Sequence, residues 1–99
     1  MKVNISELQL TISTLLEKLK ENKGNEIDLE HDYFWSLSSE DIFNIDENPK
    51  ERGLGQLSFD LELIEKLKVE NFEYALGYHL EYISNILRAL GIENLHAFQ

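Results

Sequence analysis

Residues 72–90 have the sequence FEYALGYHLEYISNILRAL, which carries the longest helical pattern in the chain. Its apolar positions recur at spacings of three and four, which places them on one face of a helix. These positions are Phe72, Ala75, Leu76, His79, Tyr82, Ile83, Ile86, Leu87 and Leu90. The stripe is wide, so we expect a helix over about 70–90 that ends at Gly91. It would lie at the centre of a helical bundle or also face a second chain.

The N-terminal part of the chain predicts another helix, over about 5–22. Its apolar residues again recur every three or four positions. Asn4, followed three residues later by Glu7, is typical of a helix start, and Gly24 is a natural stop.

A further helix is predicted over about 58–68. Ser58 is the expected N-cap, and Asp60 lies in the first turn, where the helix dipole favours a negative charge. The apolar face of this helix would consist of Leu57, Leu61, Ile64 and Leu67. Together the patterns predict a mainly α protein in which residues 1–99 form one three-helix bundle domain.

The segment between the first two helices behaves differently, because its apolar residues alternate with polar ones. The odd positions are Ile27, Leu29, His31, Tyr33, Trp35 and Leu37. This period of two predicts a half-buried extended strand with the odd residues inside and Phe34 exposed. No second strand is evident, so three arrangements stay open: an irregular stretch across the helices, pairing with a short partner strand, or pairing with another copy. A short helical turn is expected from Ser38 to about Asn44, and then a loop through Gly55.

The composition excludes several classes of protein. The chain has 99 residues, no cysteine, and 19 Asp and Glu against nine Lys and Arg, which gives a formal net charge of −10. Without cysteine there is no disulfide framework, thiolate metal site or cysteine nucleophile. The negative charge repels phosphate backbones and anionic lipids, so we expect neither nucleic acid nor a membrane as a partner. Met1 and Lys2 are not followed by the apolar stretch of a secretion signal, which favours a cytoplasmic location.

Most of the net charge lies in the middle of the sequence. Between Gly24 and Pro49 there are eight acidic residues and no Lys or Arg. One interpretation is a solvated acidic face that keeps the protein soluble. The other is a docking surface for a protein partner with a basic surface, with aromatic anchors beside the charges. The residues predicted to bind this partner are Asp28, Glu30, Asp32, Phe34, Trp35, Glu40 and Asp41.

Few residues of this chain are arranged for chemistry. Glu30-His31-Asp32, with Asp28 nearby, is the one sequence cluster of metal-ligand residue types. In a strand its carboxylates share one face at spacings of about 7 Å, and the histidine points to the other face. A hard cation needs oxygens that converge on one point, so we predict no metal site and no cofactor.

The expected function is a non-enzymatic protein-binding or regulatory module, for example an immunity-type or antitoxin-type inhibitor of a basic partner. One alternative is a small metal-dependent or hydrolase-like enzyme that uses His31 or His79 with nearby carboxylates. The default role of His79, on an apolar helix face, is a packed and hydrogen-bonded side chain. The other alternative is a structural homo-oligomerisation domain, for example a homodimer, that associates through the wide stripe of the third helix.

Several motifs occur together in a fixed order. They are Asp32-Tyr33-Phe34-Trp35, Gly55-Gln56-Leu57-Ser58 followed by Asp60, and Leu87-Arg88-Ala89-Leu90-Gly91. Over about residues 26–91 the chain thereby resembles a set of small, acidic bacterial proteins of unknown function, which share a D-Y-aromatic-W motif, a G-Q-L-S-x-D helix start and an L-R-A-x-G helix end. The resemblance implies a bacterial origin and a helical domain, and it implies no mechanism.

Overall fold

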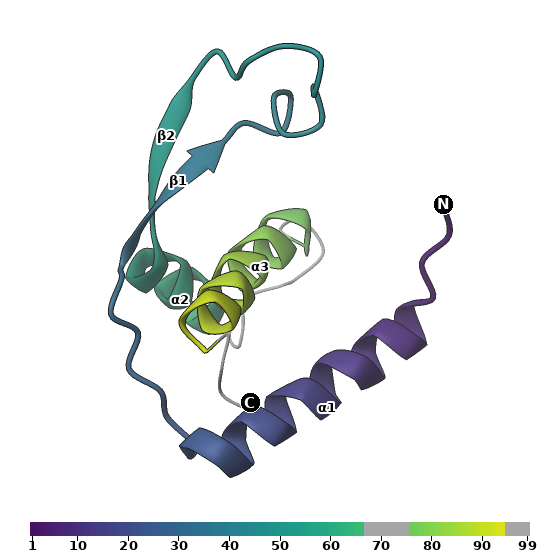
Figure 1. Ribbon diagram of the computed structural model, residues 1–99, viewed down its shortest axis with the longest axis vertical. Helices are drawn as coiled ribbons and strands as arrows, with labels where there is room; N and C mark the ends of the chain where they lie inside the picture. The colour runs from purple at the N-terminus through teal and green to yellow at the C-terminus, as the bar shows by residue number, and fades with distance from the viewer. Residues whose placement is uncertain (67–75, 95–99) are drawn as a thin grey trace. The chain divides into compact units, whose positions relative to one another are not determined.

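The structure is a computed structural model, and residues 1–66 and 76–94 are described. In chain order the elements are α1 (Ile5–Lys23), β1 (Tyr33–Leu37), β2 (Arg52–Gln56), α2 (Leu57–Lys66) and α3 (Leu76–Glu93) (Figure 1). The described part is mainly helical, as predicted, and also has a small two-stranded sheet. The chain divides into two compact units, one containing Met1–Asp28 and the other Leu29–Glu93. Among the described helices, none combines the length and the apolar character that crossing a bilayer requires.

Helix α1 begins and ends at the predicted signals. The side-chain oxygen of Asn4 accepts a hydrogen bond of 3.0 Å from the backbone N–H of Glu7, which satisfies a free donor of the first turn. At the other end Gly24 has a φ of 92°, and its N–H donates to the carbonyl of Lys20 at 2.8 Å. This left-handed backbone conformation favours glycine, which explains why the helix stops there.

Strands β1 and β2 form an antiparallel hairpin in the second unit. Trp35 lies opposite Leu54, and Phe34 lies opposite Gly55. Residues 52–56 were predicted to belong to a loop, since two glycines in five residues disfavour a strand. That prediction is wrong, because they form β2. The opposite strand explains why glycine is suited to β2. The Phe34 ring lies so close to Gly55 that a Cβ at position 55 would overlap it. Glycine at position 55 leaves room for the Phe34 ring to pack against β2.

The alternation in β1 was predicted correctly, but the two faces are exchanged. Tyr33 and Trp35 are 60% and 73% exposed, whereas Phe34 and Ser36 are half-buried. Since Phe34 packs over Gly55, the odd residues are left on the open face. Within β1, the prediction that Phe34 would be exposed and the odd residues buried is therefore wrong. Before the strand it holds for Ile27 and Leu29, which are half-buried, whereas Asp28 and Glu30 are exposed.

Helices α2 and α3 pack against each other in the same unit. Leu57 and Asp60 are the buried residues of α2, at 5% and 6% exposure. The side-chain amide of Asn85 donates to the Asp60 carboxylate at 3.1 Å, so this buried charge has a partner from α3. Leu61, which the periodicity placed on the apolar face, is exposed, because Asp60 lies toward α3 instead.

Two helix boundaries differ from those predicted. Helix α2 begins at Leu57, and α3 continues past Gly91 to Glu93. Among the described residues only Gly24 has a positive φ, so Gly91 keeps a helical conformation and does not end the helix. The predictions for Leu67, Phe72, Ala75 and the start of the third helix lie outside the described residues.

Candidate functional site

The open face of the hairpin carries large apolar side chains. Because directly opposed residues of a sheet share a face, Trp35 and Leu54 lie side by side, flanked by Tyr33 and Leu37. Leu54 is 66% exposed and Leu37 is 37% exposed. We call these four residues the hairpin face. Exposed aromatic and aliphatic groups gathered in one place are typical of surfaces that bind other proteins.

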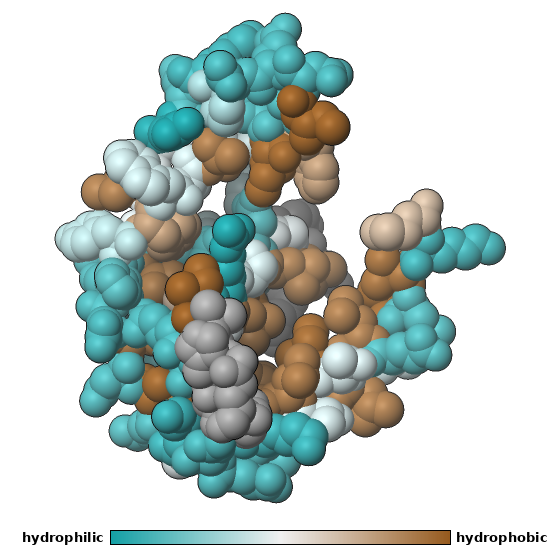
Figure 2. Space-filling model, viewed as in Figure 1, coloured by the Kyte–Doolittle hydropathy of each residue, from teal (hydrophilic) through white to brown (hydrophobic). Residues whose placement is uncertain are grey.

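The connection between the strands, residues 38–51, adds apolar groups that the sequence analysis missed. Phe43 and Ile45 are 87% and 90% exposed, and Ile42 is also exposed. At the upper end of Figure 2, where this connection lies, hydrophobic atoms reach the surface beside hydrophilic ones. The signal was present as apolar residues between acidic ones. These apolar residues recur with neither the helical nor the strand period, so periodicity does not predict them.

The same connection is acidic and locally ordered. Glu40, Asp46 and Glu47 are exposed, and no Lys or Arg lies between residues 38 and 49. The predicted turn after Ser38 is present, since the N–H groups of Asp41 and Ile42 donate to the Ser38 carbonyl at 3.1 and 3.0 Å. Negative charge and exposed apolar groups therefore occur together in one connection. This combination suits a partner that is both basic and apolar.

Asp32, one of the residues predicted to bind a partner, makes hydrogen bonds within the protein instead. Its carboxylate accepts hydrogen bonds from the Gln56 side chain at 2.9 Å, from the Ser58 N–H at 2.8 Å and from the Ser58 hydroxyl at 3.0 Å. Its carbonyl also accepts from the N–H of Leu57 at 2.7 Å. Asp32 therefore caps the start of α2 from a distant part of the chain, which is the role that the sequence analysis gave to Ser58.

These contacts stabilise the ionised form of Asp32. The hydrogen bond from Gln56 and then that from the Ser58 backbone hold the pKa of this carboxyl below its ordinary value of 3.8. The folded state therefore gains stability from Asp32 at a pH above that ordinary value. It loses this stability as the pH falls through the lower, folded pKa, because the unfolded chain takes up the proton first.

We expect Asp32→Asn to lower the melting temperature at pH 7 by about 5 °C and to flatten the loss of stability between about pH 5 and 3. Thermal unfolding followed by circular dichroism across that range measures both effects. Asp28→Asn, at an exposed position, is the matched control. If Asp28→Asn flattens the pH profile as much as Asp32→Asn does, the capping role of Asp32 is contradicted.

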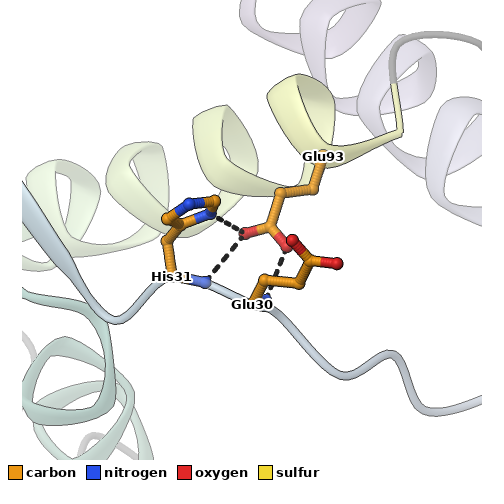
Figure 3. Close-up of side chains that lie close together, drawn as sticks. All are labelled: Glu30, His31 and Glu93. Atoms are coloured by element: carbon orange, nitrogen blue, oxygen red, sulfur yellow. Dashed lines mark hydrogen bonds and ion pairs between the residues drawn. The ribbon is translucent and has the colours of Figure 1, made fainter.

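A second group of side chains lies where α3 ends beside the segment that precedes β1. Glu93 accepts hydrogen bonds from the backbone N–H of Glu30 at 2.6 Å and of His31 at 3.4 Å, and it lies 3.6 Å from Nδ1 of His31 (Figure 3). The Glu30 N–H first, and then the contacts with His31, hold the pKa of Glu93 below its ordinary value of 4.5. Glu93 thus fastens the approach to β1 onto the last turn of α3.

The three side chains also have the composition of a metal site. One ligand atom from each of Glu30, His31 and Glu93 lies within 4.8 Å of the others. From the sequence, Glu30 and His31 were grouped with Asp32, and no metal site was predicted. In the structure the third side chain of the cluster is Glu93 and not Asp32. Glu93 is 62 residues from His31 in the sequence, so no local pattern predicts that the two lie together. One imidazole nitrogen and two carboxylate oxygens suit a divalent transition metal.

The remaining predicted site residues are dispersed. Trp35 is on the hairpin face, whereas Phe34 is turned onto Gly55. Asp28 is exposed and belongs to the unit that contains α1. His79 is half-buried, and its ring meets that of Tyr82 edge-on with centroids 5.7 Å apart, as expected for a packed side chain.

Comparisons of this chain with protein-family models, with curated proteins and with solved structures found no match.

Proposed function

We propose that this chain is a non-enzymatic, cytoplasmic protein-binding module whose β1–β2 hairpin and acidic connection dock onto a basic surface of a partner protein. The single observation that carries the proposal is the exposure of Trp35, at 73%, on a face that also presents Leu54. A soluble domain gains nothing from leaving a tryptophan in water, whereas tryptophan is a frequent anchor of protein interfaces.

The charge of the connection determines the kind of partner. In the sequence Glu40 precedes the apolar residues and Asp46 and Glu47 follow them, with no Lys or Arg in between. Such an arrangement raises the association rate with a basic surface and discourages acidic partners. An inhibitor of a basic toxin, of the immunity or antitoxin type, is one concrete form of this function. The resemblance to small acidic bacterial proteins adds the proposal of a bacterial origin.

We further propose that α1 joins α2 and α3 in a three-helix bundle within one domain. The support is the apolar stripe of α1, to which the exposed residues Ile5, Leu8 and Leu15 belong. Figure 2 shows hydrophobic atoms at the surface along this helix. An amphipathic helix takes most of its stability from covering such a stripe.

The experiment compares two variants of equal net charge in affinity capture from the source cell, with quantitative mass spectrometry. The first reverses three acids of the connection: Glu40→Lys, Asp46→Lys and Glu47→Lys. The second reverses three exposed helical acids: Glu17→Lys, Glu21→Lys and Glu65→Lys. We expect the first to lose at least about tenfold of the captured basic partner and the second to retain it. Equal capture by both variants contradicts the proposal.

A divalent-cation site is a second candidate function, favoured by the ligand atoms of Glu30, His31 and Glu93 that lie within 4.8 Å. With Mn²⁺ or Zn²⁺ as the probe, an ion at 100 times its dissociation constant stabilises the fold by about 2.7 kcal/mol. We expect this thermal shift in the wild type, and we expect it to be absent from the double variant Glu30→Gln with His31→Asn. That variant leaves the contact between Glu93 and the backbone in place. The same shift in both proteins contradicts a site at this cluster.

A further inference from the structure

One edge of β1 has no strand beside it in the part of the chain that the structure describes. The sheet there has two strands, and β1 pairs with β2 on one side. A strand at the edge of a sheet presents free N–H and C=O groups in a row, which are a template for another strand. Natural proteins protect such edges with charged residues, proline or glycine-containing bulges.

Strand β1 has none of these protections. Its sequence, YFWSL, contains no charged residue, no proline and no glycine. Strand β2, in contrast, contains two glycines and Arg52. Four of the five β1 residues are aromatic or leucine, types that pack well on a pleated surface. Of the two strands, β1 is therefore the one whose own sequence offers no protection against pairing.

Acidic residues lie on both sides of this edge strand. Glu30 precedes it and is exposed, and Glu40 follows it and is also exposed. Two copies of β1 paired antiparallel about Trp35 would bring the end of one copy that Glu30 precedes beside the end of the other that Glu40 follows, so acidic residues would come together at both ends of the pair. Bringing like charges together in this way disfavours the association. The added strand should therefore have basic residues on both sides. The β1 strand of a second copy has acidic residues there, so it does not fit.

We propose that β1 accepts one more strand along its free edge, namely an extended segment of a partner protein with an apolar or β-branched centre of about five residues and Lys or Arg on both sides. Backbone hydrogen bonds to β1 hold the segment, Trp35 and Tyr33 contact its alternate side chains, and Glu30 and Glu40 select its basic ends. This inference rests on the proposed docking function and adds the mode of binding and the chemistry of the partner segment.

The test uses the full chain and synthetic peptides of about eleven residues. One pool has two lysines at each end and a varied centre of Val, Ile, Thr, Tyr and Phe, and a matched pool has glutamates at the ends. Two further basic pools carry N-methyl groups on alternate backbone amides, one for each edge of the peptide strand. Binding is measured by fluorescence anisotropy at low salt.

We expect the basic pool to bind at least about tenfold more tightly than the acidic pool. N-methylation of one peptide edge should weaken binding by at least about tenfold, and methylation of the other edge should have little effect. Because the modification is on the peptide, the fold of the protein is not altered. In the protein variant Glu30→Lys with Glu40→Lys the preference for the basic pool should be lost.

Basic peptides that bind equally whether or not they are methylated would overturn strand addition and leave the docking function standing. The absence of binding by every pool also overturns it. A dimer of the chain by sedimentation equilibrium that is broken by Trp35→Lys would assign the edge to a second copy instead. The docking function itself fails separately, if reversing the charges of the connection leaves capture of the partner unchanged.

Discussion

Replacing Trp35 by alanine is expected to weaken binding of the captured partner at least about 30-fold, with the change mainly in the dissociation rate. The indole ring is 73% exposed in the free protein and lies next to Leu54 across the ladder. A ring that is in water before binding and covered afterwards contributes its whole buried area to the interface. The free energy of unfolding should change little, because the ring buries little area in the folded chain.

The matched control for Trp35 is Tyr78→Ala. Tyr78 is an aromatic residue of α3 that is 62% exposed, so its removal changes the surface to a similar extent. Surface plasmon resonance with the immobilised partner, together with a chemical unfolding curve for each variant, separates binding from stability. An equal loss of affinity in both variants, or no loss in Trp35→Ala, contradicts the role given to the hairpin face.

Replacing Gly55 by alanine is the second change with a large expected effect. A Cβ at this position overlaps the Phe34 ring, so either the ring moves away from β2 or the two strands separate. We expect the free energy of unfolding to fall by about 1–3 kcal/mol, the usual effect of forcing an extra group into a filled space. Urea unfolding followed by circular dichroism measures the change.

Gly53 provides the matched control for this prediction. A Cβ there meets its nearest atom, the Ser36 carbonyl oxygen, at 3.8 Å, which is ordinary contact. Gly53→Ala should therefore be neutral or slightly stabilising, because alanine restricts the unfolded chain more than glycine does. Phe34→Ala combined with Gly55→Ala should cost less than the sum of the two single changes. If Gly53→Ala and Gly55→Ala lower the free energy of unfolding equally, the packing of Phe34 against Gly55 does not stabilise the hairpin.

The helices were predictable because their signals are local. Apolar spacing placed α1 within one residue at its C-terminal end, and Asn4 and Gly24 marked its two ends. Strand β2 was not predictable in this way, because Gly53 and Gly55 disfavour a strand in isolation. They are acceptable only once the Phe34 ring lies across the ladder. The exchange of the two faces of β1 has the same origin.

The candidate site was predictable in its charge and not in its geometry. Counting acids located the negative segment. The pattern placed Trp35 on the wrong face of the strand, and its binding role is still a prediction. Asp32 and Glu93 make their contacts with residues far along the chain, which a pattern search does not detect. Glu93 also contradicts a local rule, since a carboxylate at the C-terminal end of a helix is unfavourable unless outside donors neutralise it. The N–H groups of Glu30 and His31 are those donors.

The central claim is that the hairpin face and the acidic connection contact a partner protein. Photo-crosslinking in the source cell tests it most directly, with a photoreactive phenylalanine analogue placed at position 35 in one strain and at position 65, on the exposed side of α2, in another. We predict a crosslink from position 35 to a protein with a basic surface and none from position 65. A partner that crosslinks at position 65 and not at position 35, or no crosslink at either, would contradict the account.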